Sequence, residues 1–219
     1  MLAEEPNVPA YTARTAPTSF PSGIADRMIR WDVHTYRGIA EAGLLPADVR
    51  TELVEGQIVL MSPAGALHIG YHAFLQRRLG NLLREDEYFM TGQSPLLLDD
   101  YNEPEPDAYV LPYRADHYTT LKPTATDALL VCEVAVSTLG EDLGPKARRF
   151  ARFGIPEYWV IAPAERELHY HDGPNAAGYR RTLTLAAEEA FASRLLGATT
   201  PAAWMPPVGG SARAESTGS

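Results

Sequence analysis

Three side chains near the middle of the chain, Asp107, Glu133 and Lys146, have types and spacing that suit hydrolytic chemistry. Asp107 begins a short apolar run, and Glu133 lies near the end of the apolar run 128–134. Carboxylates at the ends of neighbouring strands repel each other unless one is protonated or a hard divalent cation lies between them. We therefore predict a site for Mg²⁺ or Mn²⁺ held by Asp107, Glu133 and the backbone carbonyl of Val134.

The elements around Glu133 and Lys146 read as strand, loop, helix and strand. The run 128–134 is almost wholly apolar, as expected of a strand buried on both faces, and 157–161 is aromatic and β-branched. A helix over 141–153 tolerates Pro145 only in its first turn, which places Lys146 near the helix start. This unit predicts a βαβ crossover between adjacent parallel strands. Because the helix dipole disfavours a cation at the helix start, another group should hold Lys146 there.

A carboxylate preceded by proline, a strand carrying glutamate and a helix carrying lysine together resemble the PD-(D/E)XK nuclease superfamily. More closely, the chain resembles the Uma2 family, a restriction-endonuclease-like group, over about residues 31–185. Val136 departs from the polar residue that Uma2-like sequences often have there. The motifs that carry the resemblance are Glu52-Leu53-Val54-Glu55-Gly56, Met61-Ser62-Pro63 with His68, Glu105-Pro106-Asp107, Glu133-Val134-Ala135, Gly144-Pro145-Lys146-Ala147-Arg148 and Gly154-Ile155-Pro156-Glu157-Tyr158-Trp159.

The resemblance implies an α/β (α+β) fold with a restriction-endonuclease-like core, in which helices flank a mixed sheet of about five to seven strands. It also implies a metal-dependent endodeoxyribonuclease, a hydrolase with catalytic Asp107, Glu133 and Lys146. In this mechanism the metal activates a bound water, and Lys146 orients that water or offsets charge on the transition state. Glu52 is a supporting acid, and His68 can bond a metal ligand or the phosphate. Arg149, on the same side of the helix as Lys146, is assigned to nucleic-acid contact.

Two further groups of polar residues leave alternatives open. His68 and His72 lie four residues apart on one helical face, where they could bind a metal, but we favour packing and support of the site. No glutamate directly follows His68, so the zinc-protease signature is absent. The acidic cluster from Asp99 to Glu105 is most simply a solvated loop, with additional metal ligands as the alternative.

The remaining sequence predicts one domain between two tails. We place a flexible tail at 1–28, the nuclease-like domain at 29–196 and a second flexible tail at 197–219, because both ends are rich in Pro, Ala, Ser, Thr or Gly. Expected elements are helices over 31–42 and 63–85, a hairpin over 52–62, a strand within 88–99, and a hairpin of 167–171 and 179–184 turning around 172–174.

Composition limits the classes of protein that fit. The formal net charge is −9, whereas nucleic-acid binders are usually basic, so tight nonspecific binding of DNA is disfavoured. A nuclease remains compatible, because bound cations offset carboxylates. The single cysteine, Cys132, excludes a disulfide within the chain. Neither a signal peptide nor a membrane span is evident, so we expect a cytoplasmic protein.

Three other interpretations are open for this sequence. A catalytically silent interaction module with the nuclease fold agrees with the acidic charge and with Val136. A glycosidase needs only two carboxylates and no metal. The pair formed by Glu133 and Lys146 could also be a purely structural ion pair. Cleavage of both DNA strands by a protein with one site would favour a homodimer.

Overall fold

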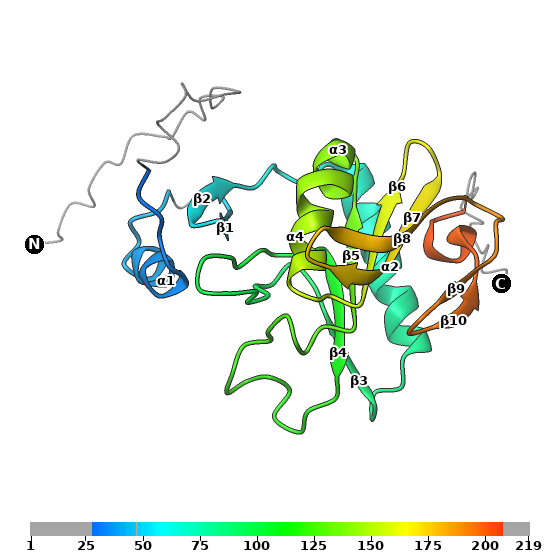
Figure 1. Ribbon diagram of the computed structural model, residues 1–219, viewed down its shortest axis with the longest axis horizontal. Coiled ribbons are helices and arrows are strands. Elements are labelled where there is room, and N and C mark those ends of the chain that lie inside the picture. Colours follow the sequence, from blue (N-terminus) through cyan, green and yellow to red (C-terminus); the bar gives the residue numbers. More distant parts are fainter. Residues whose placement is uncertain (1–27, 47, 208–219) are drawn as a thin grey trace, which may run out of the picture.

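A six-stranded mixed sheet forms the centre of the molecule in the computed structural model, which describes residues 28–46 and 48–207. Its strand order is β3-β4-β5-β6-β7-β8, and only the β5–β6 pair is parallel. Within the described ranges, no helix is long and apolar enough to cross a membrane. The strands are β3 (Tyr88–Thr91), β4 (Ala108–Pro112), β5 (Leu130–Val134), β6 (Glu157–Ala162), β7 (Glu167–Asn175) and β8 (Gly178–Ala186) (Figure 1).

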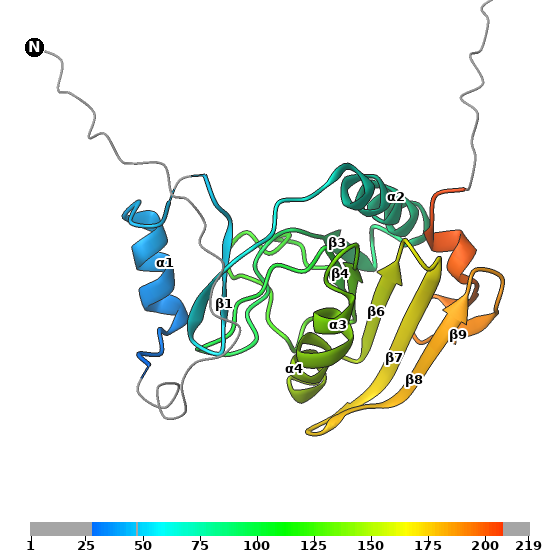
Figure 2. The same ribbon diagram turned by 90° about the horizontal axis from the view of Figure 1, so that it is seen from above.

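Helices cover both faces of the sheet. The helix α2 (Ala66–Leu82) lies on one face, and a second helical segment lies on the other: α3 (Leu139–Glu141), the π-helical η2 (Asp142–Lys146) and α4 (Ala147–Arg152) (Figure 2). Each face has its own hydrophobic cluster, one around Trp159 and one around Tyr158. Because consecutive residues of a strand point to opposite faces, β5 and β6 are apolar on both sides and fully buried. The predicted α/β fold and the parallel βαβ unit are confirmed.

A smaller N-terminal lobe stands beside the sheet (Figures 1 and 2). It consists of α1 (Val33–Glu41) and the hairpin of β1 (Thr51–Val54) and β2 (Gln57–Leu60), with a separate small core around Leu53. Asp32 caps α1 by accepting a hydrogen bond from the N–H of Thr35 at 2.7 Å. Arg37 of this lobe pairs with the buried Glu103, which ties the lobe to the loop that precedes β4.

Two predicted elements differ from the structure. Within 88–99 the apolar run 94–98 was expected to form the strand, but the strand is β3 at Tyr88–Thr91, and Leu97 and Asp99 form only isolated bridges. The chain leaves β3 at Gly92, which approaches the backbone of Asp107 so closely that a Cβ would lie 1.9 Å from its carbonyl oxygen. The C-terminal hairpin turns at 176–177 instead of 172–174, because Gly173 takes a φ of +66° and lets β7 continue to Asn175.

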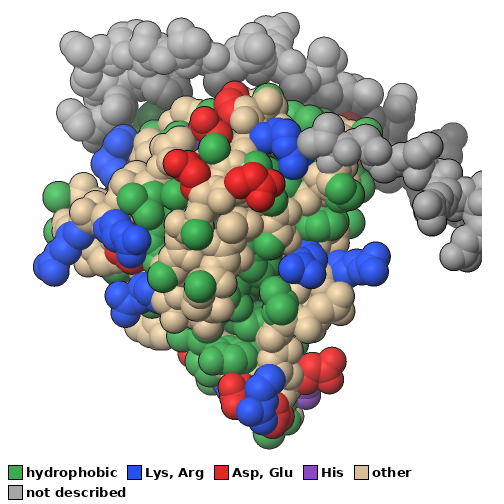
Figure 3. All heavy atoms as spheres, turned by 90° about the vertical axis from the view of Figure 1, so that its right-hand side faces the viewer, with side chains coloured by type: hydrophobic (Ala, Val, Ile, Leu, Met, Phe, Trp, Pro, Cys, Tyr) green, Lys and Arg blue, Asp and Glu red, His purple; other side chains and the backbone are tan. Residues whose placement is uncertain are grey.

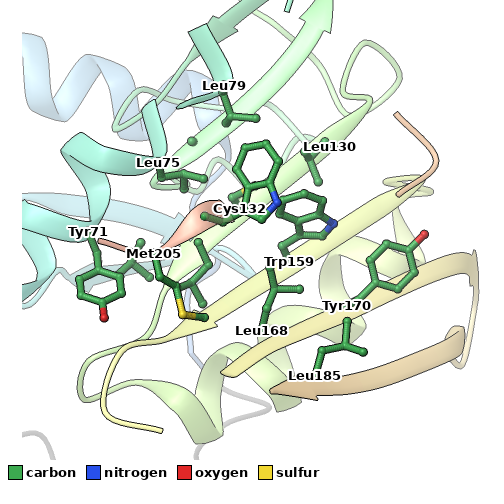
Figure 4. Close-up of a cluster of buried hydrophobic side chains, with 14 of the residues drawn as sticks. Tyr71, Leu75, Leu79, Leu130, Cys132, Trp159, Leu168, Tyr170, Leu185 and Met205 are labelled. Carbon is green, nitrogen blue, oxygen red and sulfur yellow. The ribbon is translucent and has the colours of Figure 1, made fainter. Parts of the chain in front are cut away.

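The C-terminal segment packs into the core, so the domain boundary predicted at 197 falls too early. Strands β9 (Phe191–Ser193) and β10 (Gly197–Thr199) pair antiparallel, and the 3₁₀ turn η3 (Pro201–Trp204) follows. Trp204 is 1% exposed, and its ring lies 5.1 Å from that of Trp159. Figure 4 shows Met205 of the same segment among leucines of α2 and residues of the sheet. The predicted tail regions 1–27 and 208–219 lie outside the described residues.

Burial of His171 makes the fold sensitive to acid. The side chain lies on β7 against the rings of Tyr158 and Tyr179, and its neighbours include Thr182 and His169. Burial, with a smaller contribution from His169, lowers the pKa of His171 to about 4. The unfolded chain therefore binds a proton between pH 6.5 and 4 that the folded chain does not.

We expect the free energy of unfolding to fall as the pH drops through that window, with His171 contributing on the order of 3 kcal/mol. Urea titrations at pH 7.5 and pH 4.5 measure the change. In His171→Phe the free energy of unfolding should differ less between pH 7.5 and pH 4.5 than it does in the wild type. If the variant loses as much stability between these two pH values as the wild type, the loss does not come from His171.

Candidate active site

A cavity of about 410 Å³ opens between the N-terminal lobe, the start of α2 and the edge of the sheet where β5 ends. All three residues predicted to be catalytic line it, together with Glu52 and His68. Residues far apart in the sequence therefore meet in one place, because β5 leads directly into the loop before α3 and the hairpin β1–β2 lies opposite. Its polar lining also includes Arg50, Gln93, Glu105, Ser62, Ser137, Thr138 and Asp142.

Asp107 is held by groups from α2 and β5. Its Oδ2 accepts a hydrogen bond of 2.8 Å from the N–H of Val134 and lies 3.0 Å from Nε2 of His68. Nε2 of His72 lies 2.8 Å from the backbone oxygen of Asp107 and donates to it. His68 and His72, which lie four residues apart on one face of α2, thus orient Asp107, and none of these three hydrogen bonds uses its Oδ1.

The backbone carbonyl of Val134 faces the same edge. Ala135 donates its N–H to Ile161 in β6, and alternation along the strand turns the N–H and C=O of Val134 the other way, toward Asp107. The β4–β5 ladder ends at Ala108 opposite Cys132, and continuing its register would set Pro106, which has no N–H, opposite Val134. A ladder partner from β4 is therefore missing for this carbonyl, which is a property expected of a metal ligand.

Lys146 lies between two buried carboxylates. Its Nζ is 3.1 Å from Oε1 of Glu133 and 3.1 Å from Oδ1 of Asp142. Burial raises the pKa of Glu133, with repulsion from Asp107 and Asp142 adding to it and Lys146 opposing it. Burial alone would lower the pKa of Lys146, but the surrounding carboxylates outweigh it and raise that pKa. The ammonium is therefore charged at any physiological pH.

The helix that carries Lys146 starts earlier than predicted. It begins at Leu139 rather than 141, so Pro145 lies in the interior and not in the first turn. The π-helical segment Asp142–Lys146 accommodates it, because a widened turn relieves the clash between the proline ring and the carbonyl of Glu141. The expectation that another group holds Lys146 is met by Glu133 and Asp142.

Asp142 and Thr138 were missed at the sequence level. Asp142 is 2% exposed, and its Oδ2 accepts a hydrogen bond of 2.5 Å from the hydroxyl of Thr138. The available signal was the spacing of four residues between Asp142 and Lys146, which places both on one side of a helix.

The supporting residues lie at different depths. Glu52 is 9% exposed at the cavity, where its Oε2 accepts from the N–H of Glu105. Arg50 reaches the cavity wall and pairs with Glu105 at 2.5 Å. Arg149 is 8% exposed, does not line the cavity, and has its Nε 3.8 Å from Glu55 in the β1–β2 turn. Its predicted contact with nucleic acid stays a prediction.

The donor set fits a hard divalent cation that keeps several waters. Two carboxylates and one carbonyl converge, and such oxygen ligands suit Mg²⁺ or Mn²⁺. Burial is the main cause of the raised pKa of Glu133, and the smaller contribution from repulsion by Asp107 is one that a cation between the two carboxylates would relieve. Among the described residues, no group of three or more His, Cys, Asp or Glu side chains is close enough to hold a metal by itself. A cation bound by these two carboxylates would therefore need water and the carbonyl of Val134 to complete its coordination.

Comparisons with known proteins place this cavity in context. Residues 39–203 match the family model described as "Uma2: Putative restriction endonuclease". The fold is similar to the crystal structure of a "putative nuclease belonging to DUF820" from Anabaena variabilis ATCC 29413, with a TM-score of 0.59 and 12% sequence identity. That similarity covers 76% of this chain and 96% of the other. No curated protein matches the chain.

Proposed function

Because the chain belongs to the Uma2 family, described as "Putative restriction endonuclease", we propose that it hydrolyses phosphodiester bonds of nucleic acid, with DNA as the expected substrate. One observation supports this proposal above the others. Asp107, Glu133, the carbonyl of Val134 and Lys146 meet in one cavity, although they come from the residue before β4, from β5 and from a helical segment. This combination offers oxygen ligands for a cation and a fixed positive charge beside them.

The residues of the chain have distinct parts in the proposed hydrolysis. Asp107, Glu133 and the Val134 carbonyl would hold Mg²⁺ or Mn²⁺, which when bound lowers the pKa of a water and polarises the phosphate. The water oxygen bonds to phosphorus, one phosphorus–oxygen ester bond breaks, and the leaving oxygen takes a proton. Lys146 offsets the charge that develops on the phosphate oxygens. His68 fixes the orientation of Asp107 throughout.

Charge distribution explains why a cation is needed. Six carboxylates line the cavity against Lys146 and Arg50, and phosphate would be repelled from such a lining. Binding of substrate to this acidic cavity is therefore expected to depend on the divalent cation. The six carboxylates of the cavity are Glu52, Glu105, Asp107, Glu133, Glu141 and Asp142.

The face that carries β9 and β10 has a different distribution of charge. It shows acidic side chains near basic ones, around a central region of hydrophobic side chains (Figure 3).

Metal binding and hydrolysis can be tested together. Calorimetric titration with Mg²⁺ and Mn²⁺ should show a single cation site, and nicking of supercoiled plasmid should require the same cation and stop in EDTA. Glu133→Gln should abolish nicking while keeping the side-chain shape. Nicking that persists in EDTA would exclude this mechanism. Binding of the cation without hydrolysis of DNA or RNA would favour an interaction module that retains the nuclease fold.

A further inference from the structure

Asp142 is among the most deeply buried carboxylates of the described residues, and neither of its side-chain oxygens is free. Oδ1 lies 3.1 Å from the ammonium of Lys146, and Oδ2 accepts from the hydroxyl of Thr138 at 2.5 Å. Its backbone oxygen accepts a hydrogen bond of 3.1 Å from the buried hydroxyl of Tyr158. The side chain of Asp142 is thus fixed by Thr138 and Lys146, and its backbone is fixed by Tyr158 of β6.

Glu133 is bound differently. Nζ of Lys146 is 3.1 Å from its Oε1, and no second hydrogen bond or ion pair from the described residues reaches this carboxylate. A cation held by Glu133 would compete with the ammonium for the same carboxylate, because two positive charges near one group repel each other. Lys146 then keeps a partner only if a second carboxylate, one that does not bind the cation, remains beside it.

We propose that Asp142, oriented by Thr138, is a positioning residue that keeps the ammonium of Lys146 in the cavity when Glu133 binds the cation. This inference rests on the proposed nuclease function for its catalytic consequence. The π-helical turn contributes, because it places Asp142 and Lys146 on one side of the helix and widens the helix at the position that Pro145 would otherwise distort. Asp142 acts through Lys146 and is expected to touch neither substrate nor cation.

Kinetics and metal binding separate this role from that of a ligand. For Asp142→Asn we expect kcat for plasmid nicking to fall about 10- to 100-fold, the range seen when a group that orients a catalytic residue is lost. The KM for DNA and the calorimetric Kd for Mg²⁺ should change less than threefold. Asp86→Asn, an equal change of charge at an exposed carboxylate in the turn after α2, should match the wild type.

A double-mutant cycle tests whether Asp142 acts through Lys146. If it does, Asp142→Asn should cost almost nothing further in a Lys146→Met background, because the group that it positions is already absent. Independent and additive losses would overturn the proposal. A loss of Mg²⁺ affinity in Asp142→Asn as large as that in Glu133→Gln would also overturn it, by making Asp142 a metal ligand.

Spectroscopy tests the positioning without any turnover. The chain has only two lysines, Lys122 and Lys146, so ¹⁵N-lysine labelling gives two side-chain ammonium signals at most. The buried Lys146 should give a signal that exchanges slowly with water, whereas Lys122 is 46% exposed at its side chain and should exchange fast.

In wild type with saturating Mg²⁺ the slow signal should persist, and in Asp142→Asn it should broaden or vanish while the backbone amide spectrum stays the same. Persistence of the slow signal in Asp142→Asn with Mg²⁺ would overturn the proposal. Since this measurement needs no substrate, failure of the nuclease function and failure of the positioning role give different results.

Discussion

Asp107→Asn should abolish both cation binding and cleavage while leaving the fold intact. The substitution keeps an oxygen that can accept from the N–H of Val134, so the contact between β4 and β5 survives. It removes the negative charge that, together with Glu133, attracts the cation. We expect the Kd for Mg²⁺ to rise at least about 100-fold, because affinity for hard cations follows the charge of the ligands. Plasmid nicking should fall by about 10³-fold.

A charge-matched control makes that result specific. Asp100→Asn changes an exposed carboxylate in the loop before β4, and its metal affinity and nicking rate should equal those of the wild type. Thermal unfolding of both variants should stay within a few degrees of the wild type. Undiminished Mg²⁺ affinity in Asp107→Asn would refute the metal site as drawn here.

Trp204→Ala should strongly destabilise the protein although Trp204 lies far along the chain from the site. The indole is 1% exposed, packs against Trp159 at 5.1 Å between ring centres, and donates its N–H to Thr199 at 3.0 Å. Truncation of a buried aromatic to alanine costs about 3–5 kcal/mol, because the cavity left behind is only partly filled. A shift of the unfolding midpoint by roughly 10 °C or more is expected.

Trp204→Phe provides the comparison, because it keeps an aromatic ring at the same place and loses only the hydrogen bond and part of the volume. Its loss of stability should be less than half that of Trp204→Ala. Urea titrations followed by circular dichroism measure both. If Trp204→Ala unfolds at the same urea concentration as the wild type, the C-terminal segment does not belong to the core.

Much of the fold follows from local sequence. The apolar runs of β5 and β6 indicated strands buried on both faces, because their short length and their β-branched and aromatic residues favour a strand over a buried helix. The spacing between them required a crossover helix, and therefore a parallel pair. Asp32 and Gly43 marked the ends of α1 by capping rules that act within one turn. The acidic pair was predicted from two apolar runs that each carry a carboxylate near one end, and Lys146 was predicted from its place near a helix start and from the resemblance to the Uma2 family.

Tertiary structure alone decided the rest. The segment around Trp204 looked like a tail, because short polar and small residues surround it, and only the open side of the Trp159 cluster gives its indole a place to bury. Asp142 had no role assigned from the sequence, and its burial against Lys146 is seen only in the packed structure. Arg149 is buried because the β1–β2 turn lies over α4, a long-range contact. Local propensity fixes elements, whereas burial and ion pairing depend on which distant elements pack together.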